Sequence, residues 1–552
     1  MRKCHIKKEK DVLFYIHFAR KNKYTISISS LKPNADDYLF MDGDTHPHAP
    51  TKPPSQNNKH LILQNGMTRI LSIDTIRNIV VVESGITWEV LLKELNKIGY
   101  TLISTQSALG FSVGGSFVGN AHGRKIETPM VKDTVMSFEF IDGNGHKHSI
   151  SYTQPLFHAF AGSLGLLGFI SILYIRIQPS YEVIYKTKLL PYNYNAIAYI
   201  KQLCRDGDNN ISMLNFRASY FPEEIPEILL IAEFITTTPA TSTPQTHTKQ
   251  LIDRSTTPTP APPNNNPNRY TYTSMSYFDT YTTITPQQHQ AHLSPPSVIT
   301  TTPRIITIIY FSCLVVVVWF MSFFCALDAT RWQIEKQMLV YLPRKDINVN
   351  VNDTYETWAQ PYITNFKIIE FFFPCEDFLY CHKTILFLLH KYHMRVLSSG
   401  SRIIFERGGG IGAMEADERT ARTTNIPTPP VALVNSDYPE HTNAIRGGGG
   451  GGGAKGTGYI RFSQYATLEK PYFSLTLNFI INPLFTAALT DDIRIFILDK
   501  NIKMTYHTTY EWNFTRADII KMYPEWGAFC ELKRKYDRDE LFMNLFWRMY
   551  SI

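Results

Sequence analysis

VVVESGITWEVLLKELNKIGYTL, residues 80–102, holds a strand, a turn and a helix in direct succession. Its β-branched run ends at Gly85. Apolar side chains then recur at the spacing of one helix face, at Val90, Leu91, Leu95 and Ile98. Gly99 follows directly, as a glycine that ends a helix does. Short helix and strand patterns of this kind continue on both sides of the stretch, so the sequence predicts an α+β fold.

Two glycine-bearing stretches come next, SVGGSFVGNAHGR (112–124) and GSLGLLGFISILYIRIQPSY (162–181). Glycine lets the backbone approach a bulky ligand and present N–H groups, as a pyrophosphate requires. Neither a Walker loop nor a Rossmann fingerprint is present, because GxxxxGK[ST] is absent and no GxGxxG opens a helix after a strand. Taken alone, the first stretch is equally compatible with a structural turn.

The chain has 552 residues, a length that predicts two to four domains. Its composition argues against several classes of function. The net charge of +7 is spread along the chain without a dense basic stripe, so nucleic acid is not an expected partner. The seven cysteines include no CxxC pair, which argues against a disulfide framework and a zinc site. Cys375, Cys381 and His382 are interpreted as core residues of an apolar helix, and no metal site is predicted.

Residues 236–303 are rich in Thr and Pro, and residues 407–458 are rich in Gly, so both are predicted to be disordered inserts. Between them, residues 305–327 form a run of 23 residues without a charge, long enough to span a hydrocarbon core of about 30 Å. A long buried core helix is the alternative. The sequence therefore predicts membrane localisation, as a single-pass or membrane-associated protein, with a weak preference for a cytoplasmic C-terminal side.

The order of these segments resembles the FAD-binding domain of the vanillyl-alcohol-oxidase (PCMH-type) flavoproteins. Within that family the chain is most similar to the sugar-1,4-lactone oxidases, such as gulonolactone and arabinonolactone oxidase. Further resemblance lies in KIIEFFFPCEDFLYCHKTILFLLHKY (367–392), which looks like a cap-domain strand and helix, and in YPEWGAFCELKRKYDRDELFMNLFWRMY (523–550), which looks like the C-terminal signature. The stretch SLKPNADDY (30–38) lacks the glycines and the histidine of the usual first loop, so FAD is expected to bind non-covalently.

The resemblance implies site residues. The cofactor-binding positions would be Gly114, Gly115, Ser116, Asn120, His122, Gly123, Gly168 and Ile170. In VLSSGSRIIF (396–405), Arg402 would occupy the Arg position of a Glu-x-Arg pair that acts on the substrate, while Gly400 stands where the Glu would be. His507 would be what is left of a His-Trp-Gly-Lys run near the active site. A structural histidine is the alternative for His122, and a surface histidine is the alternative for His507.

The implied architecture is a PCMH-type FAD-binding domain with an α+β cap, one hydrophobic helix and two low-complexity inserts. The expected boundaries are 1–182 for the FAD-binding domain, 183–235 for the start of the cap, 236–303 for the first insert, 304–328 for the hydrophobic helix, 329–406 for more of the cap, 407–458 for the second insert, and 459–552 for the end of the cap and a C-terminal segment that packs on the FAD domain.

The implied function is an FAD-dependent oxidoreductase acting on CH–OH groups. Its substrate would be a sugar lactone or polyol, and O2 would be the electron acceptor. The alternative is a catalytically degenerate, membrane-associated protein of the same fold with a binding or structural role. The absent first glycine loop and the glycine at position 400 favour that alternative.

Overall fold

The computed structural model describes residues 2–30, 59–106, 109–123, 125–126, 128–205, 211–219, 223, 225–237, 332, 349–350, 366–404, 470–480, 482, 484–498, 502–509 and 514–551. The hydrophobic segment 305–327, the Gly-rich insert 407–458 and the loop 31–38 lie outside these residues, as does the Thr/Pro-rich insert from residue 238 onward. Among the helices of the described residues, none is both long and apolar enough to cross a bilayer.

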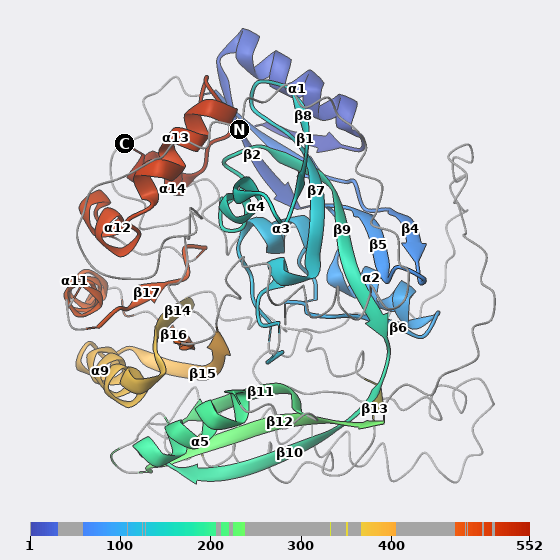
Figure 1. Ribbon diagram of the computed structural model, residues 1–552. Coiled ribbons are helices and arrows are strands. Elements are labelled where there is room, and N and C mark those ends of the chain that lie inside the picture. Colours follow the sequence, from blue (N-terminus) through green and yellow to red (C-terminus); the bar gives the residue numbers. More distant parts are fainter. Residues whose placement is uncertain are drawn as a thin grey trace, which may run out of the picture.

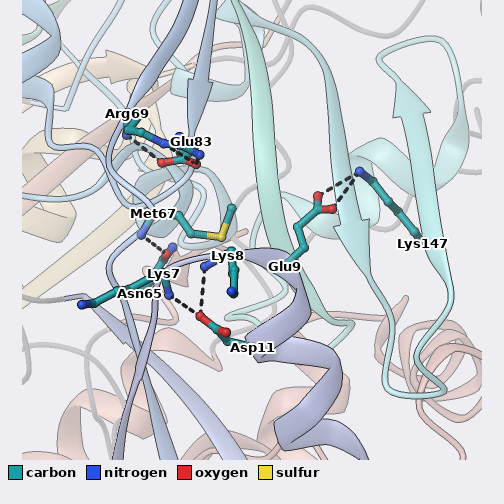
Figure 2. A network of polar contacts seen from close by, with 9 residues as sticks. All are labelled: Lys7, Lys8, Glu9, Asp11, Asn65, Met67, Arg69, Glu83 and Lys147. Atoms are coloured by element: carbon teal, nitrogen blue, oxygen red, sulfur yellow. Dashed lines mark hydrogen bonds and ion pairs between the residues drawn. The ribbon is translucent and has the colours of Figure 1, made fainter. Parts of the chain in front are cut away.

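The chain begins with a three-stranded parallel sheet in the order β1-β3-β2, covered by helix α1 (Figure 1). The elements are β1 (Arg2–Ile6), α1 (Glu9–Asn22), β2 (Tyr24–Ser30) and β3 (Lys59–Asn65). Asp11 fixes the start of α1, because its carboxylate accepts the backbone N–H groups of Lys7 and Lys8 at 2.9 and 3.1 Å (Figure 2). The apolar face of α1 then packs on the sheet through Val12, Ile16 and Ala19.

A six-stranded antiparallel sheet follows, in the order β4-β5-β9-β7-β8 with β6 paired to β9. Its strands are β4 (Ile70–Asp74), β5 (Ile79–Glu83), β6 (Tyr100–Leu102), β7 (Val135–Ile141), β8 (Lys147–Ser151) and β9 (Phe169–Pro179). Helices α2 (Trp88–Asn96), α3 (Val113–Val118) and α4 (Pro155–Phe160) contribute Trp88, Phe117 and Phe157 to one core with the sheet. Two ion pairs shown in Figure 2 lie along this sheet, Arg69–Glu83 between neighbouring strand ends and Glu9–Lys147 from α1 to β8.

The second half of the molecule is an eight-stranded sheet in the order β13-β10-β12-β11-β15-β16-β14-β17 (Figure 1). Its strands are β10 (Glu182–Pro191), β11 (Ile211–Ala218), β12 (Glu227–Thr237), β13 (Val349–Asn350), β14 (Phe366–Pro374), β15 (Arg395–Ile404), β16 (Tyr472–Ile480) and β17 (Thr505–Tyr506). Helices α5 (Tyr194–Arg205) and α9 (Phe378–Lys391) accompany it. We call it the cap sheet.

The pairing of β11 with β15 constrains any role of segment 305–327 in a membrane. Phe216 of β11 lies opposite Ser401 of β15, so strands from before and after this segment belong to one sheet. A single membrane crossing between them would put the two strands in different compartments. Both halves of the cap sheet therefore lie on the same side of any membrane with which the chain associates.

The C-terminal helices return to the first sheet. They are α12 (Arg516–Met522), α13 (Trp526–Tyr536) and α14 (Leu545–Tyr550), preceded by α11 (Thr486–Ile497). Ile26 of β2 donates its N–H to Leu541 at 2.6 Å and accepts the N–H of Met543 at 2.7 Å. Asn544 then caps α14 and donates its side-chain amide to the carbonyl of Leu164 at 3.1 Å. The segment thus packs on the N-terminal part of the chain, at β2 and next to Leu164.

The predicted α+β class is confirmed, and the local elements follow the sequence patterns with two differences. The stretch 112–124 was expected to be a loop, but Val113–Val118 form helix α3 because Ser112 caps it and accepts the N–H of Gly115. The first insert was expected to begin at residue 236, but β12 continues through Thr237 because Thr237 still pairs with Glu182 of β10.

Candidate active site

The two glycine-bearing stretches meet at Ser84, in the turn after β5. Gly114 donates its N–H to the carbonyl of Ser84 at 2.9 Å, and the Ser84 hydroxyl donates to the carbonyl of Ile170 at 2.5 Å. Leu164 also donates its N–H to the carbonyl of Val118 at 3.0 Å. The stretches around residues 115 and 165 therefore lie side by side, as expected for a shared cradle. Ser84 gave no signal in the sequence.

Close backbone packing explains why several of these positions are glycine. A Cβ atom at Gly114 would lie 2.7 Å from the Cβ of Ser84, and one at Gly123 would overlap the carbonyl oxygen of Thr105. Gly168 has φ +148°, and a Cβ there would lie 2.5 Å from the carbonyl oxygen of Ile141. These glycines thus bring protein backbones together, which is a structural role beside the one predicted from the sequence.

The N–H groups of the first stretch donate to protein acceptors. Gly115 donates to the Ser112 hydroxyl, Ser116 to the Ser112 carbonyl, and Asn120 to the carbonyl of Phe117. Gly114 donates to Ser84, as described, and Gly123 donates to the carbonyl of Pro129. The expectation of unhindered N–H groups is therefore not met at these positions in this structure.

A cluster of three buried side chains lies where this stretch meets the cap sheet: His122, Glu370 and His507. His122 follows α3, Glu370 lies on β14, and His507 follows β17 directly. The His507 N–H donates to the backbone carbonyl of Glu370 at 2.8 Å, which fixes these two positions relative to each other. The two imidazole centroids are 5.9 Å apart, and the ring of Phe372 lies 5.9 Å from one and 5.8 Å from the other.

Glu370 and His122 are in buried contact, with 3.0 Å between Oε1 and Nε2. The same carboxylate oxygen accepts the hydroxyl of Thr476 at 2.8 Å. Burial alone would raise the pKa of Glu370. The hydrogen bond from His122, the neighbouring His507 ring and the charge of Arg402 instead lower this pKa well below its usual value. Glu370 is therefore a buried carboxylate at neutral pH.

The two histidines present different nitrogens to the site. Nδ1 of His507 accepts the N–H of Thr509 at 3.3 Å, so the proton of its neutral ring is on Nε2. Burial lowers the pKa of His507 to about 4, against the opposing charge of Glu370. Nδ1 of His122 is buried and has no hydrogen-bond partner among the described residues. Because its Nε2 faces Glu370, this Nδ1 is free to accept a proton.

Arg402 reaches the same cluster from β15. Its Nη1 donates to the carbonyl of Gly123 at 3.4 Å, and its charge contributes to the lowered pKa of Glu370. The sequence suggested that the Glu partner of Arg402 is missing, because position 400 is glycine. In the structure, Glu370 on β14 supplies a carboxylate within electrostatic reach of Arg402. Sequence reasoning missed Glu370, although one acidic residue inside the apolar run KIIEFFFP was an available signal.

The site residues predicted from the sequence form two groups, one at the His122–Glu370–His507 cluster and one away from it. Asn120, Gly123, Arg402 and both histidines are brought together, with the backbone of Asn120 contacting His507. Gly114, Gly115 and Ile170 lie instead around the Ser84 turn, and Gly168 packs on Ile141 at the end of β7. The Ser116 hydroxyl accepts from the Trp88 indole N–H at 2.8 Å and donates within the protein, so it is already engaged.

Buried side-chain atoms near the glycine stretches offer a test of whether the site suits a polar cofactor. The hydroxyls of Ser104, Thr105 and Ser163 are buried and lack a hydrogen-bond partner among the described residues, like Nδ1 of His122. Ser104 and Thr105 border Gly123, and Ser163 lies in the second stretch. An unpaired buried hydroxyl is costly, so these groups fit a polar ligand such as a dinucleotide.

A second region with suitable chemistry is a cavity of about 450 Å³ at the carboxyl ends of β1 and β3. Its lining is mostly basic and consists of His5, Ile6, Lys7, Lys8, Gly66, Arg69 and Glu83. Figure 2 shows Lys7, Lys8, Arg69 and Glu83 of this set. Positive side chains in a concave surface attract phosphate groups. The sequence analysis did not single out this cavity, because its residues are dispersed along the chain.

Comparison with known proteins adds a family match over part of the chain. Residues 48–151 match the profile of the FAD binding domain family. A Neurospora crassa protein provisionally named as a D-arabinono-1,4-lactone oxidase is 28% identical over 125 residues, which is 22% of this chain and 22% of that protein. Because the match spans about a fifth of that relative, it bears on part of the chain only.

Two solved structures share the fold along nearly the whole chain. A cholesterol oxidase from B. sterolicum has a TM-score of 0.60 at 13% identity, covering 100% of this chain and 94% of the other. A solvent-stable cholesterol oxidase has a TM-score of 0.59 at 12% identity, covering 99% and 94%. At such identities the likeness concerns the fold. The predicted resemblance to PCMH-type flavoproteins is confirmed, and FAD is the cofactor that the family match indicates.

Proposed function

We propose that the chain oxidises a hydroxyl group of an aldonolactone or a polyol, with O2 as the acceptor that returns the flavin to its oxidised form. The observation that carries this proposal is the pair of His122 and Glu370. An imidazole with a free Nδ1, backed at Nε2 by a buried carboxylate 3.0 Å away, is the arrangement of a general base.

Each residue of the cluster has a defined part in this reaction. Nδ1 of His122 takes the proton of the substrate hydroxyl, and the carboxylate of Glu370 stabilises the imidazolium that results. Arg402 stabilises the negative charge that develops on the substrate oxygen. His507 stays neutral, because burial keeps its pKa at about 4, and acts as a hydrogen-bond donor through Nε2. His122 was predicted to bind the cofactor, and this assignment adds a proton-accepting role.

When bound, FAD supplies the two-electron oxidation of the substrate carbon. The residues that would hold it are those of the two glycine-bearing stretches, with the unpaired hydroxyls of Ser104, Thr105 and Ser163 as hydrogen-bonding groups. The closed environment excludes water, since His122 and Glu370 are 6% and 4% exposed in their side chains. The choice of a lactone substrate is supported by the Neurospora crassa relative.

The test is a purification in mild detergent, followed by an absorption scan for flavin bands near ~370 and ~450 nm. Oxygen consumption is then measured with aldono-1,4-lactones and alditols. Replacing Arg402 with Met is expected to lower kcat/KM by about 100-fold or more while flavin content stays constant. Arg77→Met is the matched control, because among the described residues Arg77 pairs with its neighbour Asp74 in the β4–β5 hairpin. Equal activity of both variants would contradict the proposed role of Arg402.

A second candidate function is a degenerate binding protein of the same fold. It is favoured by the internal hydrogen bonds of the N–H groups at Gly114, Gly115, Ser116 and Gly123, which leave fewer donors for a diphosphate. Protein that stays colourless after incubation with excess FAD would support this candidate over the oxidase.

Membrane association belongs to the same proposal. It is supported by the 23 uncharged residues at 305–327. In the proposed arrangement, both halves of the cap sheet lie on the same side of the membrane. Protease protection with tags at both ends of the chain should give the same accessibility for each tag. Opposite accessibility would overturn it.

A further inference from the structure

A second group of metal-ligating side chains, separate from the His122–Glu370–His507 cluster, lies at the hairpin that joins β7 and β8. Asp142, His146 and His148 each direct one ligand atom to a common point, and these atoms lie within 4.8 Å of one another. Nε2 of His148 is 3.0 Å and Nδ1 of His146 is 3.6 Å from the same carboxylate oxygen, Oδ2 of Asp142. One imidazole would suffice for an ion pair, but here two converge on one oxygen.

These separations suit a coordinated ion. Zinc binds imidazole nitrogen and carboxylate oxygen at about 2.0–2.1 Å in tetrahedral geometry, which puts neighbouring ligand atoms roughly 3.3 Å apart. The two measured separations, 3.0 and 3.6 Å, bracket that value. The side chain of His146 is 74% exposed, so its ring is free to adjust while the other positions of the ion remain open to solvent.

The two inner ligands are already held in place. Oδ1 of Asp142 accepts the N–H groups of Asn144 and His146 at 2.9 and 2.8 Å, which holds the carboxylate with Oδ2 facing the two imidazoles. The ring of His148 stacks on Phe140 with 4.8 Å between centroids, and Tyr536 of α13 packs on its edge. Fixed orientation of this kind is what surrounding contacts provide to ligands in natural metal sites.

The side chain between the two histidines does not compete for the site. Alternate residues of a strand point to opposite faces, so Lys147 projects away from its neighbours. Its ammonium group pairs with Glu9 of α1 (Figure 2) and also with Glu139 of β7. The cluster therefore keeps a carboxylate and two imidazoles on one face, without a cation among the three ligand atoms.

We propose that Asp142, His146 and His148 form a binding site for a divalent transition-metal ion of the Zn²⁺ or Cu²⁺ class. The donor set of two imidazoles and one carboxylate suits these ions and is unfavourable for Mg²⁺ or Ca²⁺, which prefer oxygen ligands. The turn that carries the site also contacts the C-terminal segment, because Gly143 donates its N–H to Tyr536 at 2.8 Å. The ion strengthens the turn on which α13 docks.

The test is titration of the metal-free, flavin-containing protein with Cu²⁺, followed by electron paramagnetic resonance. Oxidised flavin gives no signal in that measurement, so the readout is independent of catalytic activity. The protein is expected to bind one equivalent of Cu²⁺, and the spectrum should show hyperfine splitting from two nitrogens. Excess Zn²⁺ should displace the bound Cu²⁺. His146→Ala is expected to weaken binding about tenfold or more, comparable to the loss of a supporting contact in a metal site. Because His146 is exposed, this variant should fold normally.

Two controls separate this site from other histidines. His17→Ala, at an exposed position on α1, should leave the Cu²⁺ titration unchanged. His507→Gln, in the buried cluster at the candidate active site, should also leave it unchanged. Binding that survives in His146→Ala, that disappears in either control, or that is absent from the unaltered protein would overturn the proposal.

Discussion

The buried ring of His507 should make the stability of the protein depend on pH in a defined window. Burial lowers its pKa from 6.5 to about 4, so the folded state binds a proton less readily than the unfolded state. The stability that the neutral ring contributes is present above pH 6.5 and is lost as the pH falls toward 4. One pKa unit is worth about 1.4 kcal/mol, so the full loss approaches about 3 kcal/mol, of which about 2 kcal/mol has occurred at pH 5.

His507→Gln removes this titration while keeping the local hydrogen bonds, because a glutamine oxygen still accepts the N–H of Thr509 and its amide still donates. Urea unfolding is measured for both proteins at about pH 7.5 and about pH 5. The unaltered protein should lose about 2 kcal/mol more than the variant between these conditions. His17→Gln on α1 is the reference for replacing an exposed histidine. Equal losses in the unaltered protein and His507→Gln would refute the assignment of a buried neutral ring.

Three further substitutions test the site and its scaffold. Glu370→Gln preserves the shape of the side chain but removes the carboxylate that stabilises the imidazolium of His122. The value of kcat should therefore fall by about 100-fold or more at constant flavin content. An unchanged kcat would exclude the general-base assignment. Gly123→Ala should lower the free energy of unfolding by about 1–3 kcal/mol, because the new methyl group overlaps the carbonyl of Thr105. The control is Gly527→Ala on α13, where a methyl group meets no atom within 4 Å and should not destabilise the protein. Similar urea midpoints for the two variants would argue against this packing. Lys533→Met leaves the fully buried carboxylate of Asp537 without its cation and should lower the free energy of unfolding by about 3–5 kcal/mol, measured by the same urea method. A variant as stable as the unaltered protein would disprove the buried pair.

Local sequence patterns were sufficient for the elements and for part of the site. The run 80–102 became β5, α2 and β6 because Gly85 and Gly99 mark its turns, and Gly99 adopts φ +72°. Arg402 and His507 were identified from a resemblance, and the structure brings both to His122. The elements could be predicted because each depends on residues close in sequence, whereas the roles of Arg402 and His507 stay predictions.

The remainder depends on contacts between distant segments. Glu370 belongs to the site only because β14 pairs with β16 and β17, and the partners of a strand are not encoded by its own periodicity. The glycines illustrate another limit. A glycine needed for close approach to a ligand and one needed for close approach to another backbone have the same sequence signal, so Gly114 was interpreted by its ligand and the contact with Ser84 was not foreseen.

The pairing of strands β11 and β15 makes this protein suitable for division into two polypeptides. A first piece ending at Thr237 would carry His122 and the β11 edge, and a second piece beginning before Phe366 would carry Glu370, Arg402 and the β15 edge. Neither piece alone holds a proton acceptor together with its carboxylate, and each exposes a strand edge that the other completes. Turnover would then report the association of the two pieces, which makes the cap sheet a natural design point for a split-enzyme sensor.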